Sequence, residues 1–374
     1  MHCLHIISNL NSGGAERVLY NICCHDKCNT HTVVSMSNSG FYGSKLEEIN
    51  IKVFCLNIKS LKDLFIGFIR LRKIIKLHKA DVIQTWMYHA DLLGGITAYL
   101  SGERNVFWNI RHASLSASTT KPMTIIVAKC CAKLSKIIPH KIICCSSEAA
   151  KYHIHFGYQK NKIQIISNGY DTANFTPNSE LISSFRQKIG VESNVPLIGM
   201  VARFSPEKDH DNILRSLQIL KKSNKSFFCI FIGMDMDVNN KKLTSWLQSY
   251  KLENHTLLLG VQHNIPDFLN VLDLHILSSR SEAFPNVIAE AMACGTPCVS
   301  TKVGESEYII GDTGWVVAPQ DPTSLAKKIS DALNEMSDVE LWNHRRNNAR
   351  SRIVNNFSVK KMVLSYNSHW KGDF

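Results

Sequence analysis

The sequence predicts an α/β protein built from two doubly wound domains, each with helices on both faces of a parallel sheet. Three observations lead to this fold class. With 374 residues the chain is long for one hydrophobic core and suits two domains. Short apolar runs alternate with helical stretches, which is the order that parallel sheets need. The strand–turn–helix order that opens the chain begins again near residue 197, which indicates a second domain of the same kind.

The composition is that of an ordinary globular protein. Hydrophobic residues make up 44% of the chain and charged residues 20%, which argues against disorder. Lys and Arg interrupt the longest apolar runs, and no run reaches the length of a membrane-spanning helix. No signal peptide is visible, because the chain opens directly into the strand-like run Leu4–Ser8. The twelve cysteines show no Cys-x-x-Cys spacing, so we expect reduced thiols in a cytosolic protein and no metal site.

The positive charge is concentrated in the first half of the chain. Residues 1–178 carry 21 Lys and Arg against 10 Asp and Glu, whereas residues 179–374 carry 22 against 21. This asymmetry indicates an acidic partner for the first half alone: an anionic lipid surface, a pyrophosphate-linked molecule or a nucleic acid. No interleaving of basic and aromatic residues is present, so a nucleic acid is disfavoured. A basic face that only keeps the protein soluble is the plainer alternative.

The opening segment LHIISNLNSGGAERVLYNI predicts a strand, a glycine-rich turn and a helix. Gly13 and Gly14 let the backbone come close to a ligand, and the helix N-terminus behind them favours anions. The spacing matches neither a Walker loop nor a complete Gly-x-Gly-x-x-Gly. The turn alone is therefore equally consistent with an ordinary connection between a strand and a helix.

Two later stretches of the first half, residues 59–79 and 121–141, combine an apolar face with Lys and Arg. A basic amphipathic helix can lie in an anionic membrane interface, or it can simply pack on its own sheet. Between the two stretches, the buried strand DVIQT is followed by His89. A histidine at the carboxyl end of a strand can reach a ligand hydroxyl, although a lone histidine is more often structural. Arg111 and His112 follow a further strand in the same way.

The second half opens with PLIGMVARFSPEKDHDNILRSLQIL, which again predicts a strand, a turn and an amphipathic helix. Arg203 follows the strand directly, and Lys208 comes just before the helix. Two cations and a helix N-terminus at one strand end suit a diphosphate.

The stretch Ser281–Gly295 carries the most specific signal. A strand at 272–277 leads into a loop, Pro285 is expected to start a helix, and Gly295 to end it. Glu290 is the exception in this otherwise apolar helix, because a buried carboxylate is costly unless it is hydrogen-bonded. Glu282 lies in the strand-to-helix loop, where open α/β sheets bind their ligands. The two glutamates could therefore hold two parts of one polar ligand.

The run EAFPNVIAEAMACGTP resembles the two-glutamate signature of the retaining glycosyltransferases of family 4. The SGGAER segment, the strand followed by His89, and the Arg203…Glu-Lys208 spacing are similar to other segments of that family. The resemblance implies that Glu282 contacts the donor sugar, Glu290 the ribose, and His89 the sugar. It implies that Arg203 and Lys208 hold the diphosphate, and that the backbone amides near Gly13 and Gly14 face the same group. It also implies, as a looser assignment, that Val261 contacts the nucleobase. The implied catalytic residues are His89, Arg203, Lys208 and Glu282, and the implied donor-binding residues are Gly13, Gly14, Ala283, Phe284, Pro285, Asn286, Val287 and Glu290.

The family usually has glycine at the position of Ala283, so the added methyl group is expected to narrow the donor pocket. The resemblance further implies the GT-B arrangement, in which two Rossmann-like domains face each other across a cleft. Residues 1–178 would bind the acceptor, residues 179–355 the nucleotide sugar, and a helix within 356–374 would return to the first domain.

The implied function is retaining transfer of a hexosyl or N-acetylhexosaminyl group from a nucleotide sugar, a UDP-sugar being favoured. The expected acceptor is an undecaprenyl-pyrophosphate-linked saccharide of bacterial O-antigen or surface polysaccharide synthesis. We expect a cytoplasmic enzyme at an anionic membrane surface, on the inner face of the cytoplasmic membrane. No Asp-x-Asp segment lies near the predicted site, so two cations replace a bridging metal, and no cofactor is expected. An epimerase or phosphorylase of the same fold, or a nucleotide-sugar-binding protein without activity, remain as alternatives.

Overall fold

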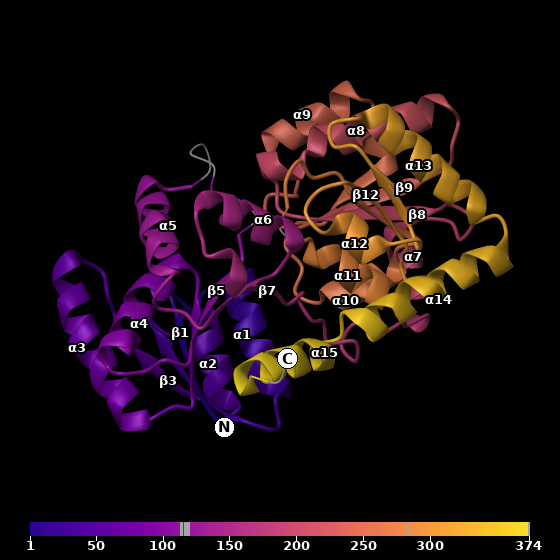
Figure 1. Cartoon of the computed structure of the whole chain (residues 1–374). Helices are drawn as coiled ribbons and strands as arrows, with labels where there is room; N and C mark the ends of the chain where they lie inside the picture. The colour runs from indigo at the N-terminus through magenta and orange to yellow at the C-terminus, as the bar shows by residue number, and fades with distance from the viewer. Residues whose placement is uncertain (113–114, 116–119, 283, 373–374) are drawn as a thin grey trace. The chain divides into compact units, whose positions relative to one another are not determined.

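The computed structural model describes residues 1–112, 115, 120–282 and 284–372 (Figure 1). The chain forms two compact units. Unit 1 comprises Met1–Gly169 together with Val359–Phe374, and unit 2 comprises Tyr170–Ser358. Residues 170–178, which we assigned to the first domain from the sequence, thus belong to unit 2 by their contacts.

Unit 1 is organised around a parallel seven-stranded sheet of order β3-β2-β1-β4-β5-β6-β7. The strand order reverses between β1 and β4, which pair in parallel so that Ile7 lies beside Trp86. This reversal opens a crevice at the carboxyl ends of these two strands. The strands are β1 (His2–Ile7), β2 (Thr30–Ser35), β3 (Lys52–Cys55), β4 (Val82–Trp86), β5 (Val106–Ile110), β6 (Lys141–Cys144) and β7 (Ile163–Ile165).

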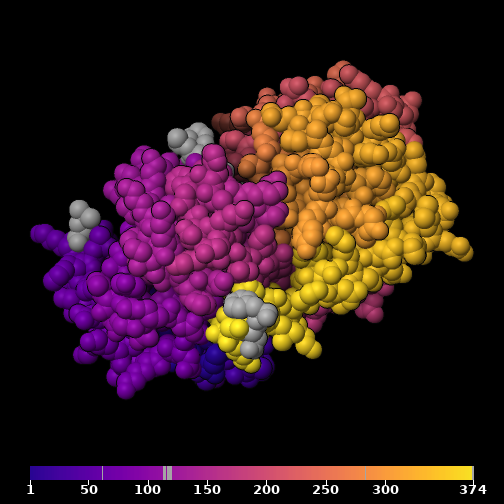
Figure 2. Space-filling model, in the orientation of Figure 1, coloured from indigo at the N-terminus to yellow at the C-terminus, as the bar shows by residue number. Residues whose placement is uncertain are grey.

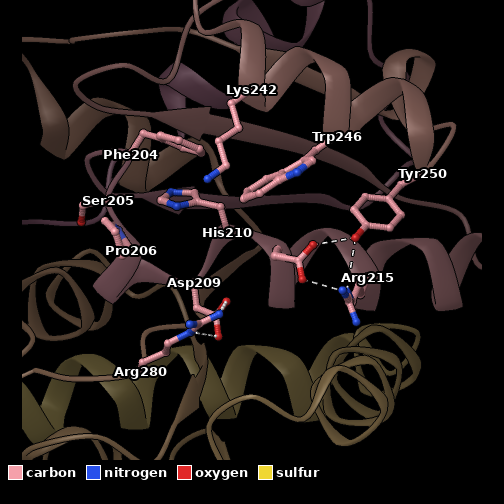
Figure 3. A pocket seen from close by; sticks show the side chains of 11 residues that line it. Phe204, Ser205, Pro206, Asp209, His210, Arg215, Lys242, Trp246, Tyr250 and Arg280 are labelled. Atoms are coloured by element: carbon pink, nitrogen blue, oxygen red, sulfur yellow. Dashed lines mark hydrogen bonds and ion pairs between the residues drawn. The ribbon is translucent and has the colours of Figure 1, made fainter.

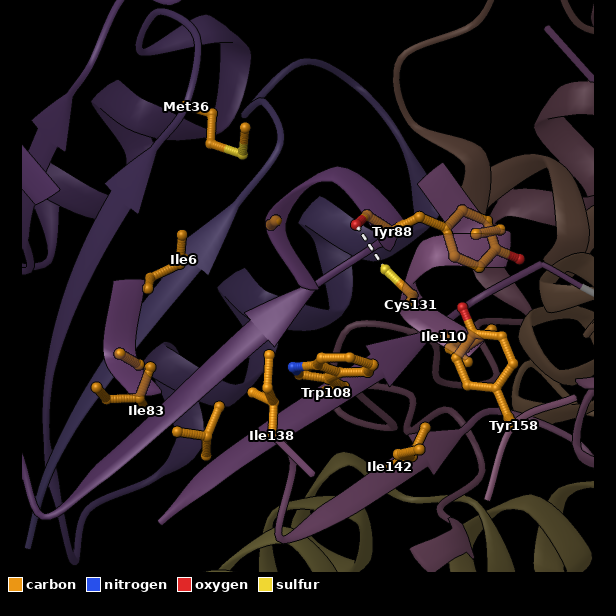
Figure 4. Packing of buried hydrophobic residues seen from close by; sticks show 14 of the residues in the cluster. Ile6, Met36, Ile83, Tyr88, Trp108, Ile110, Cys131, Ile138, Ile142 and Tyr158 are labelled. Atoms are coloured by element: carbon orange, nitrogen blue, oxygen red, sulfur yellow. Dashed lines mark hydrogen bonds between the residues drawn. The ribbon is translucent and has the colours of Figure 1, made fainter. Parts of the chain in front are cut away.

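Helices cover both faces of this sheet, because side chains along each strand alternate between two buried clusters. Leu4 and Ile6 belong to the cluster on the face covered by α3, α4, α5 and α6, part of which Figure 4 shows. Cys3 and Ile7 belong to the cluster beneath α1, α2 and α15. The helices of unit 1 are α1 (Gly14–His25), α2 (Gly40–Glu48), α3 (Leu61–His78), α4 (Tyr88–Leu100), α5 (Pro122–Leu134), α6 (Ser147–Phe156), η1 (Lys160–Lys162) and α15 (Val359–Lys371).

The stretch 121–141 is not one helix. The helix α5 ends at Leu134, and Lys141 already begins β6. The Ser135 hydroxyl donates to the carbonyl of Ala132 and so closes the helix end. Only the first two thirds of this stretch therefore form an amphipathic helix.

The last helix, α15, is anchored to the sheet of unit 1 by polar contacts as well as by apolar packing. Trp370 donates from Nε1 to Oε1 of Gln84 at 3.1 Å, and the Tyr366 hydroxyl accepts from Nδ2 of Asn109 at 2.7 Å. Arg111 also donates to the Tyr366 hydroxyl. These buried hydrogen bonds fix the rotation of α15 on the sheet.

Unit 2 is built around a parallel six-stranded sheet of order β10-β9-β8-β11-β12-β13. The order again reverses in the middle, here between β8 and β11. The strands are β8 (Leu197–Val201), β9 (Phe228–Ile232), β10 (Thr256–Leu258), β11 (Leu274–Leu277), β12 (Cys298–Thr301) and β13 (Trp315–Val317). The helices are α7 (Glu180–Ile189), η2 (Pro206–Lys208), α8 (His210–Lys222), α9 (Lys241–Ser249), η3 (Glu253–His255), α10 (Ile265–Val271), α11 (Asn286–Ala293), α12 (Ser306–Ile310), α13 (Pro322–Glu335) and α14 (Val339–Asn356).

The strand expected at 272–277 begins only at Leu274. The carboxylate of Asp273 accepts hydrogen bonds from the backbone N–H of Leu197 and from Arg186. Its backbone N–H donates to the carbonyl of Leu197. Asp273 therefore ties the start of β11 to β8 and to α7, and the ladder proper starts one residue later.

Candidate functional site

At the strand reversal of unit 2, a lysine and a glutamate from two different loops form an ion pair. Lys208 follows β8 and Glu282 follows β11, and Nζ of the lysine lies 2.5 Å from Oε1 of the glutamate. Ser279 donates from its hydroxyl to the same carboxylate oxygen at 2.7 Å. Both side chains of the pair are mostly buried, with 21% and 14% of their surface exposed. The structure therefore brings together two of the four residues that the sequence assigned to catalysis.

The two loops that carry this pair are braced against each other. The buried Ser278 hydroxyl donates to the carbonyls of Lys208 and Asp209, at 2.9 and 3.1 Å. The backbone N–H of Arg280 donates to the carbonyl of Glu207, and the Arg280 side chain forms an ion pair with Asp209 at 2.7 Å. Such contacts hold functional groups in place before a ligand binds. Our sequence reasoning missed Ser278, Ser279 and this ion pair, although the serines stand only a few residues before Glu282.

Arg203 lies at the same edge of the sheet, two residues after β8, with an exposed side chain. A backbone hydrogen bond lowers the pKa of Glu207, and the charges of Arg203 and Lys208 lower it further. The loop between β8 and α8 thus presents two cations within a short stretch of backbone. Cations of this kind can form charge-assisted hydrogen bonds with the oxygens of an anionic ligand.

The helix predicted after the loop is present as α11. Pro285 is its N-cap residue, and Gly295, with a φ of +77°, follows its end, so the predicted start and stop signals are confirmed. Within α11 the side chain of Glu290 is buried, with 6% of its surface exposed. A carboxylate is thereby placed inside unit 2 behind the loop of Glu282.

The residues between the two glutamates differ in what they offer to a ligand. Phe284 is buried, with its ring stacked on Tyr170 and edge-on to Phe357, and Pro285 is buried as well. The Tyr170 hydroxyl donates to Oδ1 of Asn286 at 2.7 Å. The side chain of Phe284 therefore belongs to the core of unit 2, and only its backbone is left for a donor.

The remaining predicted donor residues of unit 2 are placed as follows. Val287 is half-buried on α11, and Ala283 lies outside the residues that the structure describes. Val261 is 59% exposed in the loop after β10, two strands away from β8 in the same sheet. Its position at the carboxyl edge of the sheet is compatible with a contact to a ligand, although it forms no part of the cluster around Lys208.

In unit 1, His89 lines a pocket of about 480 Å³ at the carboxyl edge of the sheet. The pocket is lined by Ser8, Met36, Ser37, Ile58, Lys59, Ser60, Leu64 and His89. Burial lowers the pKa of His89, and the charge of Lys121 lowers it further. The imidazole is therefore neutral near pH 7 and offers a hydrogen bond without a charge.

The backbone before His89 is strained. Met87, the N-cap residue of α4, has a φ of +74° and a ψ of 156°, a conformation that costs a non-glycine residue about 1–3 kcal/mol. Its N–H donates to the carbonyl of Asn109, and its carbonyl accepts from the N–H of Asp91, both at 2.9 Å. Next to it, the Tyr88 hydroxyl donates to Nε2 of His153, whose Nδ1 donates to the carbonyl of Ala149. These contacts hold the strained turn and place His89 in the first turn of α4.

Gly13 and Gly14 are exposed at the start of α1, and Gly13 is its N-cap residue. A Cβ atom at Gly13 would overlap with the Glu16 carboxylate, which folds back over the first turn of the helix. Burial raises the pKa of Glu16. The helix N-terminus therefore has a carboxylate of its own, with which a phosphate group would have to compete.

Arg111, which directly follows β5, has a structural role. Its guanidinium donates to Asn168 and to the Tyr366 hydroxyl, and it lies over the ring of Trp86. It therefore joins α15 to the sheet.

One group among the described residues has a geometry that could hold a metal ion: His5, Cys23 and His31, all buried. A hydrogen-bond chain accounts for the two histidines of this group without a metal. Trp86 donates to Nδ1 of His5, so Nε2 of His5 donates to Nδ1 of His31 at 3.0 Å. Nε2 of His31 then faces Asp26 at 3.4 Å. Although burial opposes it, hydrogen bonds from His31 and Asn29 lower the pKa of Asp26.

None of the helices in the described part of the chain is both long enough and apolar enough to span a membrane.

Comparison with known proteins covers both halves of the chain. Residues 12–174 match the family model described as Glycosyltransferase Family 4, and residues 182–352 match Glycosyl transferases group 1. The chain is 26% identical over 317 residues to the UDP-Gal:alpha-D-GlcNAc-diphosphoundecaprenol alpha-1,3-galactosyltransferase of Escherichia coli, covering 84% of this chain and 80% of the relative. It is also 26% identical over 298 residues to the capsular polysaccharide biosynthesis glycosyltransferase CapM of Staphylococcus aureus, covering 77% and 76%.

Among solved structures, the Anabaena protein Alr3699/HepE in complex with UDP is similar over the full length of both chains, with a TM-score of 0.86 at 23% identity. This likeness confirms the predicted GT-B fold of two Rossmann-like domains. The matches of both halves and the shared fold identify the chain as a member of the GT-B glycosyltransferases, similar to the enzymes of bacterial O-antigen and polysaccharide synthesis.

Proposed function

We propose that this glycosyltransferase moves a hexosyl or N-acetylhexosaminyl group from a UDP-sugar to an undecaprenyl-pyrophosphate-linked saccharide, with retention at the anomeric carbon. The product would enter O-antigen or surface polysaccharide synthesis. The observation that carries the proposal is the braced Lys208–Glu282 pair at the strand reversal of unit 2. The E. coli relative, whose name includes a UDP-sugar and a diphosphoundecaprenol, supports the substrate classes.

The chemical task is the departure of a nucleoside diphosphate while positive charge develops on the sugar. Lys208 and Arg203 supply two positive charges at one strand end, so they would stabilise the departing diphosphate electrostatically. They would do this without a bridging metal ion. Once phosphate oxygens attract Lys208, the carboxylate of Glu282 is released to accept hydrogen bonds from sugar hydroxyls.

The other residues have binding roles in this proposal. The buried carboxylate of Glu290 would hold the ribose hydroxyls, and the amides of Gly13 and Gly14 would face the diphosphate. His89, which is neutral near pH 7, would contact the sugar near the bond that breaks. Neither glutamate is required as a covalent nucleophile, because both are explained as binding groups.

The acceptor side of the proposal depends on the surface of α3. This helix packs on the sheet through Leu71 and Ile75, which are buried, yet it exposes 70% of Phe65 and 72% of Leu77. Ile66 and Ile69 are half exposed as well. Large apolar side chains exposed together on one helix are typical of an interaction surface.

Lys and Arg residues stand between these apolar side chains along α3. Exposed apolar side chains flanked by cations suit an anionic lipid interface. The exposed face of α3 lies on the outer surface of unit 1, in violet at the left of Figure 2. We therefore propose a cytoplasmic enzyme that binds the inner face of the cytoplasmic membrane peripherally. The neighbouring pocket, with Met36, Ile58 and Leu64 beside Lys59, would take the pyrophosphate end of the acceptor.

A donor screen tests the proposal. The purified protein is given UDP- and GDP-sugars, with and without a bacterial lipid extract, while nucleoside diphosphate release is followed. We expect nucleoside diphosphate release from one UDP-sugar, and we expect this release to increase with lipid. It should be lost in Glu282→Ala and in Arg203→Ala. The control is Glu340→Ala, on the exposed start of α14. Formation of an epimeric nucleotide sugar without lipid would favour an epimerase, and release only with added phosphate would favour a phosphorylase. Nucleotide binding without any release would favour a protein without activity.

Two further readouts test the finer claims. NMR of the product is expected to show the anomeric configuration of the donor, and an inverted product contradicts retention. Turnover is expected to persist in a chelator of divalent cations, and its loss contradicts metal independence.

A further inference from the structure

A second pocket, of about 470 Å³, opens on unit 2 between the first turns of α8 and the helix α9 (Figure 3). Its size falls in the range of small-molecule sites. Among the described residues, none of those assigned to the donor lines it. The proposed function therefore leaves this pocket without an occupant.

Aromatic rings form the walls of the pocket. Phe204 and Trp246 are only partly buried, and their ring centroids lie 5.8 Å apart. The ring of His210 lies 5.0 Å from that of Phe204, and Tyr250 adds a further half-buried ring. Figure 3 shows Lys242 reaching toward His210 between Phe204 and Trp246. Rings left partly exposed around a hollow offer flat apolar faces to a ligand.

The charged groups around the pocket are largely paired with each other. Arg280 binds Asp209 at 2.7 Å, and Arg215 binds Asp211 at 2.8 Å. The Tyr250 hydroxyl donates to Asp211 at 2.5 Å. Lys242 lies over the Trp246 ring at 4.9 Å and forms no ion pair within the described part of the chain. The lining therefore carries a single excess positive charge and several fixed donors and acceptors.

His210 contributes an unused hydrogen-bonding group. Only 2% of its surface is exposed, and its Nε2 has no hydrogen-bond partner among the described residues. Buried polar atoms of side chains are usually hydrogen-bonded, so a ligand that hydrogen-bonds to this atom would be stabilised. Burial and the charge of Lys208 lower the pKa of His210 to about 4, so the ring is neutral near pH 7.

From these features we infer that the pocket binds a pyranose ring of a glycan. The C–H faces of a pyranose are apolar and would stack on Trp246 and Phe204. Its hydroxyls would satisfy Nε2 of His210 and use Lys242 and the paired carboxylates. A second nucleoside diphosphate does not fit, because one excess positive charge cannot balance it. A fatty chain does not fit either, because it would leave the polar groups unpaired.

The ring can belong to the saccharide of the acceptor or to a polysaccharide already made, since the recognition chemistry is the same. Asp209 and Arg280, which brace the loops of Lys208 and Glu282, also line this pocket. A sugar bound here therefore contacts the structure that holds the donor residues.

Binding is tested by saturation-transfer NMR with the methyl glycosides of galactose, N-acetylglucosamine and glucuronic acid. UDP is present in excess, so that the donor site is occupied. We expect at least one glycoside to bind and to lose affinity by about tenfold in Trp246→Leu and by a smaller factor in Lys242→Ala. The neighbouring exposed residues of α9 give the matched controls, Lys241→Ala and Ser245→Ala, which should bind as the unaltered protein does.

The same variants separate the competing outcomes. Glycoside binding that is lost in Glu282→Ala but kept in Trp246→Leu would place the sugar in the donor site and overturn the inference. UDP affinity that falls in Trp246→Leu would make the pocket a nucleotide site, and no glycoside binding up to about 20 mM would overturn the inference as well.

Turnover separates the two sources of the sugar. A KM for the lipid-linked acceptor that rises in Trp246→Leu, at an unchanged KM for the donor, assigns the ring to the acceptor. Unchanged values for both, together with lost glycoside binding, assign it to a finished polysaccharide. Both results support a sugar site, and failure of the donor screen would leave the binding result intact.

Discussion

In both units the strand order reverses at the same position of the sheet, but the side chains beside the two reversals differ in charge and polarity. In unit 2 the loops after β8 and β11 carry Arg203 and the mostly buried pair of Lys208 and Glu282. In unit 1 the corresponding edge carries apolar side chains, serines, one lysine and the neutral His89. The topology thus provides two crevices, and the side chains decide their use. In the proposed function, the charged edge binds the diphosphate of the donor and the apolar edge binds the amphiphilic acceptor.

The charged edge should be the more sensitive of the two. Replacing Glu282 by Gln removes the partner of Lys208 and the acceptor for sugar hydroxyls, so kcat/KM is expected to fall about 10²–10³-fold. Lys208→Met should lose a similar amount, and the double variant little more, because the two residues act as a pair. UDP release measures the effect, with Glu340→Gln as the control. Turnover within about twofold of the unaltered protein would contradict the assignment of this edge to the donor.

The apolar edge should respond to the removal of His89 by a smaller factor. In His89→Ala, kcat is expected to fall about 10–100-fold, which is less than the 10²–10⁴-fold typical of groups that transfer a proton, because His89 is proposed only to contact the sugar. His78→Ala, at the far end of α3, is the control. A loss in His78→Ala as large as that in His89→Ala would show that the effect is not specific to this edge.

The pH dependence of kcat tests the role of His89 at the apolar edge. Burial lowers the pKa of His89, so the neutral form persists below the ordinary titration range of histidine. Activity that depends on neutral His89 is therefore retained as pH falls through 6.5 and lost only at more acidic pH. The kcat–pH profile measures this, compared with the profile of His89→Ala. A loss centred above pH 6.5 would contradict a neutral imidazole in this role.

The surface beside the apolar edge should bind anionic lipid. In the double variant Phe65→Ser, Leu77→Ser, two largely exposed apolar side chains are removed, so vesicle affinity is expected to fall about tenfold. Co-sedimentation with vesicles that contain phosphatidylglycerol measures it. The control is Val238→Ser, an exposed apolar residue of unit 2. Equal losses in the control, or none in the α3 variant, would remove α3 from the membrane proposal.

The smallest effect concerns the strained turn before His89. Met87→Gly relieves a strain of about 1–3 kcal/mol but loses about 0.5–1 kcal/mol in backbone entropy. The free energy of unfolding is thus expected to rise by up to about 2.5 kcal/mol, while kcat falls because His89 is held less firmly. Denaturant unfolding and UDP release measure the two quantities. Lys79→Gly, at another residue with positive φ, should gain stability at unchanged kcat, and a parallel fall in its kcat would contradict a specific role for Met87.

Much of the fold was predictable because its signals are local. The alternation of apolar runs with helical stretches gave the parallel sheets, and Pro285 with Gly295 gave the bounds of α11. The weaker assignments failed where a local pattern continued past a structural boundary. The stretch 121–141 keeps its basic apolar pattern although the helix stops at Leu134. The spacing of apolar residues does not change where the chain leaves the helix and enters a strand, so it does not locate that boundary.

The sequence by itself determined which residue types follow each strand: two cations after β8, a glutamate after β11 and a histidine after β4. The tertiary structure alone decided which of them meet. Lys208 and Glu282 are 74 residues apart and form a pair because β8 and β11 are neighbours in the sheet. The Phe284 side chain instead packs in the core, and Arg111 hydrogen-bonds to α15. His210 and Trp246 line one pocket. Strand order and helix packing depend on contacts between distant segments, and neither spacing nor propensity along the chain contains that information.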